Sequence, residues 1–102
     1  MPNLATSEDL KQLHSLSVLY VEDDEGVQQQ LALFLRRRVG KLFVAANGKE
    51  GLEIFRREKP DIVVTDVSMP IMGGIEMAEA IKAENYDIPV ILTTAYNEPD
   101  FF

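Results

Sequence analysis

Short apolar runs alternate with amphipathic segments from Ser17 onward, and this alternation predicts the fold. The apolar runs are continuous and rich in β-branched residues, as is typical of strands that are buried on both faces. They predict strands at residues 17–21, 42–46, 61–65 and 90–93. Between the runs, apolar side chains recur every three or four residues, which indicates helices with one buried stripe.

Three helices are expected between these strands. Their apolar stripes are Val27, Leu31, Phe34 and Leu35 in the first, Leu52 and Phe55 in the second, and Ile75, Ala78 and Ile81 in the third. Strands that alternate with helices in this way favour a parallel sheet with right-handed crossovers. The sequence therefore predicts an open α/β sandwich.

The N-terminal residues do not share this alternation. Thr6 followed by Asp9 resembles a helix-capping box, so residues 1–16 are expected to form a leader with a short helix. Residues 17–102 are then expected to form one domain, because 102 residues leave room for no more.

Composition narrows the class of protein. With 46% hydrophobic and 26% charged residues, the chain resembles an ordinary globular domain. A net charge of −7 argues against direct nucleic-acid binding, because phosphate backbones require clustered Lys and Arg. The basic cluster Arg36–Arg38 is expected at a helix end, where it complements the helix dipole.

The composition also limits the cellular compartment and the kinds of metal site that the chain can have. The chain has no Cys, so disulfides and thiolate metal sites are excluded. No stretch approaches the roughly 20 apolar residues that a membrane span needs. We therefore expect a soluble, cytoplasmic domain that does not act at a membrane.

Acidic and hydroxyl side chains follow three of the four predicted strands. Glu22, Asp23 and Asp24 come directly after the first strand, Asp66 after the third, and Thr94 after the fourth. Ligands of open parallel sheets bind beyond the carboxyl ends of the strands. These side chains are therefore expected to converge there.

Converging carboxylates repel one another unless a cation lies between them. Oxygen ligands without His or Cys select a hard ion, so Mg²⁺ is expected, with Mn²⁺ as a substitute. For Asp24 and Glu25 alone, a second interpretation stays open: acidic side chains that stabilise a helix N-terminus.

Three separated motifs closely resemble the receiver domains of two-component response regulators. They are Val21-Glu22-Asp23-Asp24, the segment 61–70 with Gly73-Gly74, and the segment 90–95. Their order and spacing match, and the resemblance runs from about Ser17 to the last residue. It implies a flavodoxin-like, doubly wound sheet of strand order 2-1-3-4-5.

The resemblance also implies a role for each site residue. Asp66 would accept a phosphoryl group from a histidine kinase or a phosphotransfer protein. Asp23 would bind Mg²⁺ directly, Glu22 would support the metal, and Ser68 would offer its backbone carbonyl. Thr94 would be the hydroxyl that turns toward the phosphoryl oxygens and switches the output surface. Such a domain is a signalling switch, not a turnover enzyme.

The C-terminal part departs from the family pattern. Such receivers continue through a fourth helix, a fifth strand that ends in Lys, and a last helix, whereas this sequence ends at Phe102 and has no Lys after Lys82. The domain is therefore expected to be C-terminally incomplete, as a piece of a longer chain. A homodimer that pairs through the exposed fourth strand is the alternative.

Two other functions compete with the phosphorylation switch. One is a phosphorylation-independent module for dimerisation or docking, which would not need the acidic constellation. The other is a phosphatase with an aspartyl intermediate of the haloacid-dehalogenase type. That class places a second Asp two residues after the nucleophile, where this chain has Ser68.

Overall fold

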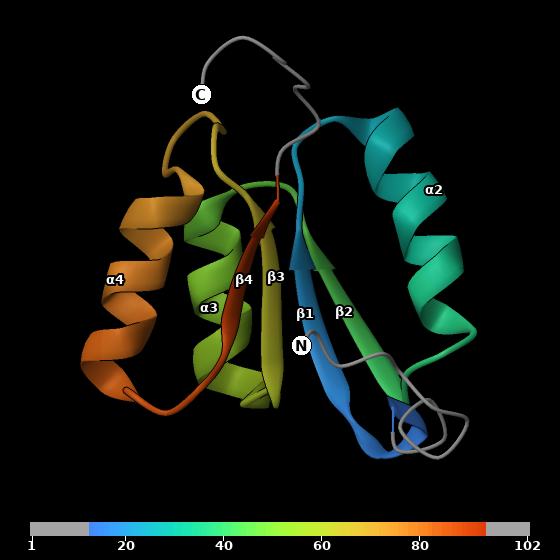
Figure 1. The fold of residues 1–102 in the computed structure, drawn as a ribbon. Helices are drawn as coiled ribbons and strands as arrows, with labels where there is room; N and C mark the ends of the chain where they lie inside the picture. Colours follow the sequence, from blue (N-terminus) through green and yellow to red (C-terminus); the bar gives the residue numbers. More distant parts are fainter. Residues whose placement is uncertain (1–12, 94–102) are drawn as a thin grey trace, which may run out of the picture.

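The computed structural model describes residues 13–93, which form a parallel sheet with helices on both faces (Figure 1). The strands are β1 (Ser17–Val21), β2 (Lys41–Ala45), β3 (Ile62–Asp66) and β4 (Val90–Thr93). They lie in the order β2-β1-β3-β4, and all three pairings are parallel. This order confirms the predicted flavodoxin-like topology over these strands. A 3₁₀ helix, η1 (Leu13–Ser15), precedes β1, and the leader helix proposed around Thr6 lies outside the described residues.

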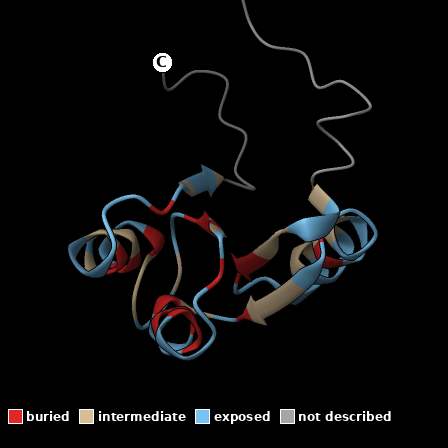
Figure 2. Ribbon diagram, turned by 90° about the horizontal axis from the view of Figure 1, so that it is seen from below, coloured by how far each residue is buried: buried red, intermediate tan, exposed pale blue. Residues whose placement is uncertain are grey.

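The three predicted helices are present. They are α2 (Glu25–Arg36), α3 (Gly48–Glu58) and α4 (Gly74–Glu84). Seen along the strands, α3 and α4 cover one face of the sheet and α2 covers the other (Figure 2). Among the described residues, no helix is long and apolar enough to cross a membrane.

The main core lies between the sheet and the helix pair α3 and α4. Its buried members include Leu19, Val21 and Val63 from the strands and Met77 and Ile81 from α4. These buried positions face inward from both layers (Figure 2). The tight packing of the core fixes the ends of β1 and β3 relative to each other.

Two helices each expose one residue of the apolar stripe that the sequence predicted. In α4, Ile75 is 51% exposed, whereas Gly74, Met77 and Ile81 are buried. The cause lies at the helix start, because a Cβ on Gly74 would lie only 2.0 Å from the backbone oxygen of Asp66. The inward face therefore begins at Gly74, and its neighbour Ile75 points to solvent.

In α2, Val27, Leu31 and Leu35 of the predicted stripe are partly buried, so the prediction is wrong for one residue. Phe34 is 49% exposed, and Ala32 is the buried residue of the helix. The Gln28 side chain, one turn before Ala32, donates hydrogen bonds to the backbone oxygens of Glu22 (2.8 Å) and Ala45 (3.2 Å). These bonds turn a partly polar face of α2 toward the sheet.

The helix ends follow the sequence more closely. Asp24 caps α2 by accepting a hydrogen bond from the Val27 amide (3.0 Å), which supports the helix-end interpretation of this residue. At the other end, Arg38 donates to the backbone oxygen of Phe34 (3.0 Å). The basic cluster therefore stabilises a helix C-terminus, as predicted.

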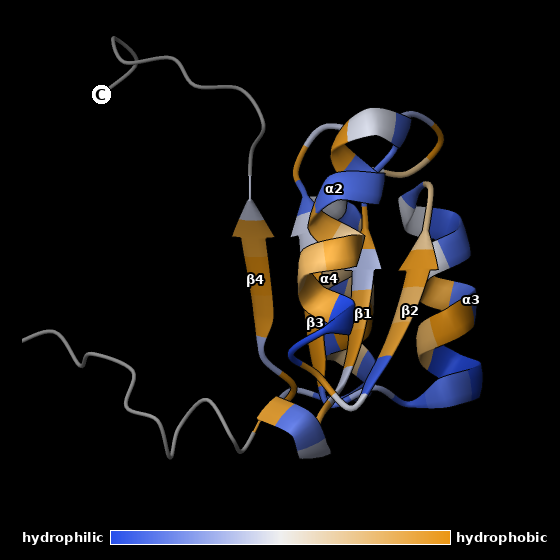
Figure 3. Cartoon of the chain, turned by 90° about the vertical axis from the view of Figure 1, so that its right-hand side faces the viewer, coloured by the Kyte–Doolittle hydropathy of each residue, from blue (hydrophilic) through white to orange (hydrophobic). Residues whose placement is uncertain are grey.

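Strand β4 forms an edge of the described sheet. Ile91 is 50% exposed and Leu92 is 47% exposed, so the expected burial of both faces does not extend to this strand. Most of the strand is strongly hydrophobic, and it stands at the margin of the sheet (Figure 3). Burial on both faces is confirmed for the central strand β1, where four of five residues are buried.

Candidate functional site

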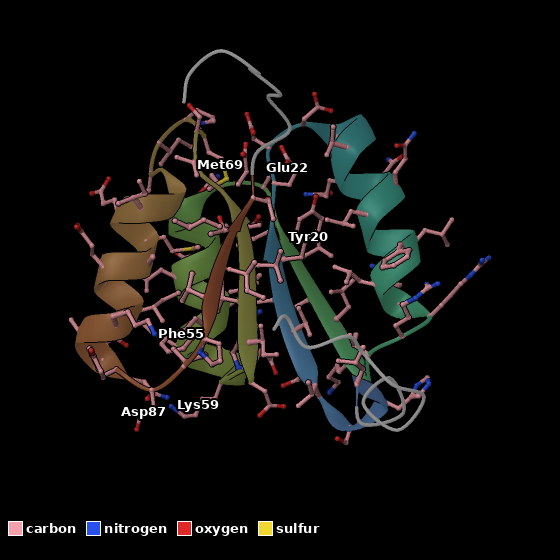
Figure 4. The ribbon with its side chains drawn as sticks, in the orientation of Figure 1. Tyr20, Glu22, Phe55, Lys59, Met69 and Asp87 are labelled. Carbon is pink, nitrogen blue, oxygen red and sulfur yellow. The ribbon has the colours of Figure 1, made fainter. Side chains whose placement is uncertain are left out.

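Three carboxylates meet at the carboxyl end of β1 and β3. One oxygen each from Glu22, Asp23 and Asp66 can be chosen so that all three atoms lie within 4.8 Å of one another. Glu22 is 2% exposed and Asp66 is 8% exposed, whereas Asp23 is open to solvent. Glu22 and Met69 mark this end of the sheet in Figure 4. We call these three residues the acidic cluster.

Glu22 is held through its side chain and through its backbone. Its Oε2 accepts a hydrogen bond from the Asp24 amide (3.0 Å), and its own amide donates to the backbone oxygen of Ala45 (3.0 Å). Burial raises the pKa of the Glu22 carboxyl, and the negative charges of Asp66 and Asp23 raise it further, against the Asp24 amide, which lowers it. The position of Glu22 is therefore fixed at an electrostatic cost.

Asp66 is placed by its neighbours on β3 and by the start of α4. Its Oδ1 accepts a hydrogen bond from the Val67 amide (2.9 Å), and its backbone oxygen accepts one from the Thr65 hydroxyl (2.8 Å). Gly74 is packed directly against that backbone oxygen. Within residues 13–93, no hydrogen bond is found between Oδ2 of Asp66 and a donor.

The negative charge of the cluster also affects the pKa of the buried Tyr20. Its side chain is 1% exposed, and its hydroxyl has no hydrogen-bond partner in the described part of the chain. Burial first, and then the charges of Glu22, Asp66 and Asp24, raise the pKa of Tyr20 to about 12. Among the described residues, neither Lys nor Arg forms an ion pair with the cluster.

The structure brings together three of the five predicted site residues. Glu22, Asp23 and Asp66 form the cluster, as the strand-end rule predicted. Ser68 lies two residues past Asp66 in the exposed loop between β3 and α4. Thr94 lies outside the described residues. Its neighbour Thr93 is paired with Asp66 across the two strands.

Two residues near the cluster were not predicted from the sequence. Gln28 ties α2 to the ends of β1 and β2 through its side-chain amide. Its position in the sequence, four residues after the helix-capping Asp24, could have indicated that this polar side chain faces the sheet. Tyr20 was hidden within an apolar run, where only its hydroxyl sets it apart.

A hollow of about 560 Å³ lies at the other end of the sheet. Its walls include Phe55, Lys59, Asp61 and Asp87, and Lys59 and Asp87 mark this opposite end in Figure 4. Two of its carboxylates have partners: Glu84 pairs with Arg56, and Asp61 accepts hydrogen bonds from Ser17. The acidic cluster does not line this hollow.

Comparison with known proteins shows the family to which the chain is related. Residues 18–102 match the family model described as the response regulator receiver domain. The transcriptional regulatory protein AfsQ1 of Streptomyces coelicolor is 37% identical over 82 residues, which are 80% of this chain and 36% of that protein. Sporulation initiation phosphotransferase F of Bacillus subtilis is 37% identical over 83 residues, which are 81% of this chain and 67% of that protein.

Solved structures agree with the sequence relatives. The N-terminal domain of an uncharacterised protein from Wolinella succinogenes superposes with a TM-score of 0.76 at 34% identity, over 82% of this chain and 68% of that one. The response regulator TrrA of Thermotoga maritima, solved in complex with Mg(2+)-BeF, gives a TM-score of 0.75 at 32% identity, over 80% and 71% of the two chains. The chain thus spans about a third of AfsQ1 and about two thirds of the shorter relatives.

Proposed function

The chain belongs to the receiver-domain family of two-component response regulators, and from this premise we propose that Asp66 is its phosphoryl acceptor. The observation that carries the proposal is the acidic cluster, which gathers carboxylates from the ends of two strands. A module that only docks or dimerises has no use for a buried Glu22 whose pKa is raised. The comparisons also give the docking alternative no support.

The acidic cluster suits a hard divalent cation. We propose that Asp23 and Asp66 bind Mg²⁺ or Mn²⁺ directly, with Glu22 in support and the Ser68 carbonyl as a further oxygen ligand. When bound, the cation would offset the charge of the carboxylates and of the incoming phosphoryl oxygens. The response regulator TrrA, solved in complex with Mg(2+)-BeF, supports this choice by similarity.

The proposed reaction is transfer of a phosphoryl group from a phosphohistidine to Asp66. An O–P bond forms at a carboxylate oxygen of Asp66 as the N–P bond of the donor breaks. The bonding electron pair stays on the imidazole nitrogen, which takes up a proton from solvent. Such a transfer has a loose transition state and mainly needs alignment, which the Val67 amide and Gly74 give to Asp66.

The proposed output is a switch. Phosphorylation adds negative charge and acceptor oxygens at Asp66. Thr94 directly follows Thr93, the strand partner of Asp66, so its hydroxyl is the proposed donor to the new group. We propose that the donor is a histidine kinase or a phosphotransfer protein in the cytoplasm, and that the domain acts as a switch and not as a turnover enzyme. Any output of a longer protein would lie in further sequence, as the longer AfsQ1 illustrates.

The test is phosphorylation of the full chain by phosphoramidate in the presence of Mg²⁺. We expect the intact mass to increase by one phosphoryl group in the wild type and not in Asp66→Asn, because an amide is not nucleophilic. Thr94→Ala should still be modified, because its hydroxyl is the proposed hydrogen-bond donor to the phosphoryl group and not the acceptor of that group. A phosphoryl group retained in Asp66→Asn would refute the assignment.

A further inference from the structure

The hollow at the amino end of the sheet has the size of a small-molecule site. Its volume of about 560 Å³ lies within the roughly 300–1,000 Å³ that such sites span. It opens between the C-terminal end of α3 and the segment that joins α4 to β4. Phe55, Lys59 and Asp87 mark it in Figure 4.

The inner wall of the hollow is apolar and firmly packed. Phe55 is 6% exposed and Ile88 is 4% exposed, and both belong to the main core. Pro60 and Pro89 also line the hollow, and a proline has no backbone N–H to offer a ligand. The hollow therefore presents a preformed apolar surface, as is typical of sites for small molecules.

The charged side chains around the hollow fall into two groups. Arg56, Asp61 and Glu84 already have partners within the protein. Lys59 and Asp87 are exposed, and within residues 13–93 the side chain of neither residue forms an ion pair or a hydrogen bond, also not with the other. The hollow thus holds one cation and one anion that are available to a ligand.

The backbone at Lys59 carries a cost that the turn does not explain. Lys59 caps the C-terminus of α3 with a φ of 50° and a ψ of 62°, and its amide donates to the Phe55 backbone oxygen (2.9 Å). Glycine or asparagine adopts this left-handed conformation at lower cost. The helix dipole gives no reason for a lysine either, because Arg56 and Arg57 already lie in the last turn. A long cationic side chain at this position therefore indicates a use for its ammonium group.

The charge of Lys59 acts across the hollow. The Arg56 guanidinium lowers the pKa of Glu84 most, and Lys59 adds a smaller effect of the same sign. Glu84 lies at the end of α4, whereas Lys59 follows α3, so the two helices face each other across this space. A ligand of the hollow would contact both elements.

These groups favour a ligand that carries both signs of charge. A purely anionic ligand would meet the carboxylates of Asp61, Glu84 and Asp87, and a purely cationic one would meet Arg56 and Lys59. A zwitterion avoids both conflicts, because each of its charges can face the opposite charge of the protein. An apolar part of the same molecule would cover the inner wall.

We propose that this hollow binds a small zwitterion with an apolar body, of the class of the α-amino acids with apolar side chains. Lys59 holds the carboxylate of the ligand, Asp87 holds its ammonium group, and Phe55 and Ile88 contact its side chain. The hollow lies at the opposite end of the sheet from the acidic cluster, so the inference does not depend on the proposed role of Asp66.

The test follows the backbone amides of the isotope-labelled full chain by NMR during titration with L-phenylalanine, L-leucine and L-valine. N-acetyl-L-phenylalanine lacks the positive charge of the amino acid, and L-phenylalaninamide lacks the negative one. Lys59→Asn removes the cation of the protein and accepts the left-handed backbone, and Asp87→Asn removes the anion. Lys49→Gln is the matched control, because Lys49 is an exposed lysine at the other end of α3, outside the hollow.

We expect at least one of the amino acids to shift the amides of residues 55–61 and 84–89 saturably at millimolar concentration. Blocking either charge of the ligand should weaken the affinity about tenfold, which corresponds to about 1.4 kcal/mol. Lys59→Asn and Asp87→Asn should each cause a loss of the same size, and Lys49→Gln should match the wild type. The inference would be overturned by the absence of saturable shifts in these segments with all the amino acids. Equal affinity for the blocked ligands, or an unchanged affinity in either Lys59→Asn or Asp87→Asn, would overturn it as well.

Discussion

The two ends of the sheet treat their carboxylates in opposite ways. At the carboxyl end, Glu22, Asp23 and Asp66 converge without a basic partner in the described residues, and the pKa of Glu22 is raised. At the amino end, Glu84 accepts hydrogen bonds from the Arg56 guanidinium (2.5 and 2.8 Å), and its pKa is lowered. A charged glutamate is therefore unfavourable at the carboxyl end, whereas at the amino end an arginine neutralises its charge.

Asp61 completes the contrast between the two ends. Its Oδ2 accepts hydrogen bonds from the amide (2.8 Å) and the hydroxyl (3.1 Å) of Ser17, which ties the start of β3 to the start of β1. The amino end therefore uses acidic groups to join elements. The carboxyl end gathers carboxylates that have no ion pair among the described residues, which is the arrangement that we propose as a cation site.

The largest effect is expected from removing a carboxylate at the carboxyl end of the sheet, with a carboxylate at the amino end as the control. Asp23→Ala should slow phosphorylation by phosphoramidate at least about 100-fold, because loss of a metal ligand removes several kcal/mol of charge stabilisation from the transition state. Asp87→Ala, an exposed aspartate at the amino end, should leave the rate unchanged. Initial rates of mass increase measure both variants, and equal rates in the two would erase the distinction between the ends.

Mg²⁺ should stabilise only a chain whose carboxyl end is intact. A ligand of the native state at a hundredfold excess over its Kd adds about 2.7 kcal/mol to the free energy of unfolding. For a domain of this size, each kcal/mol raises the melting temperature by about 4–8 °C. Thermal melts should show this shift in the wild type and in Asp87→Ala, and not in Asp23→Ala. A shift of the same size in Asp23→Ala would remove the metal site.

The pH dependence of stability should have opposite signs at the two ends. Because the folded pKa of Glu22 is raised above its ordinary value of 4.5, its contribution is fully favourable below pH 4.5 and is lost as pH rises through the raised pKa. Without metal, Glu22→Gln should therefore be more stable than the wild type at pH 7, and the difference should shrink as pH falls. Urea unfolding across this pH range measures it. A Glu22→Gln variant that is less stable than the wild type at pH 7 would contradict the raised pKa.

The smallest effect is expected at the Arg56–Glu84 pair. The lowered pKa of Glu84 means that its contribution is present above pH 4.5 and is lost as pH falls through the lowered pKa. The side chains are 55% and 38% exposed, so Arg56→Gln should destabilise the fold only slightly, and the difference should vanish in high salt. Urea unfolding at two salt concentrations would show it. A large, salt-independent loss would indicate that the pair does more than neutralise charge.

The sequence predicted the sheet and the acidic cluster because both follow from the order of the apolar runs along the chain. The apolar runs of β1 and β3 are unambiguous, and the strand-end rule converts their order into the meeting of Asp23 and Asp66. The exposure of Ile75 at the start of α4 could not be predicted in this way. It depends on the contact of Gly74 with the Asp66 backbone, which turns Ile75 outward. Periodicity shows that a helix has an apolar stripe but not which residues a neighbouring strand excludes from it.

The hollow at the amino end was equally hidden. In the sequence, Lys59 is one basic residue near a helix end, and only the structure shows its positive φ and its place in the same hollow as Asp87. Ser68 and Thr94 remain predictions from the family pattern. The described residues place Ser68 in an exposed loop and include Thr93 but not Thr94.

The most direct test of the account is to locate the phosphoryl group in the modified chain. The wild-type protein would be treated with phosphoramidate and Mg²⁺, digested, and sequenced by tandem mass spectrometry, with a sample in excess EDTA as control. The account predicts one modified residue, Asp66, in the Mg²⁺ sample and almost none in the EDTA sample. Modification at Asp23 or Glu22, or equal modification of Asp66 without the cation, would contradict the claim that the acidic cluster is a metal-dependent phosphoryl-acceptor site.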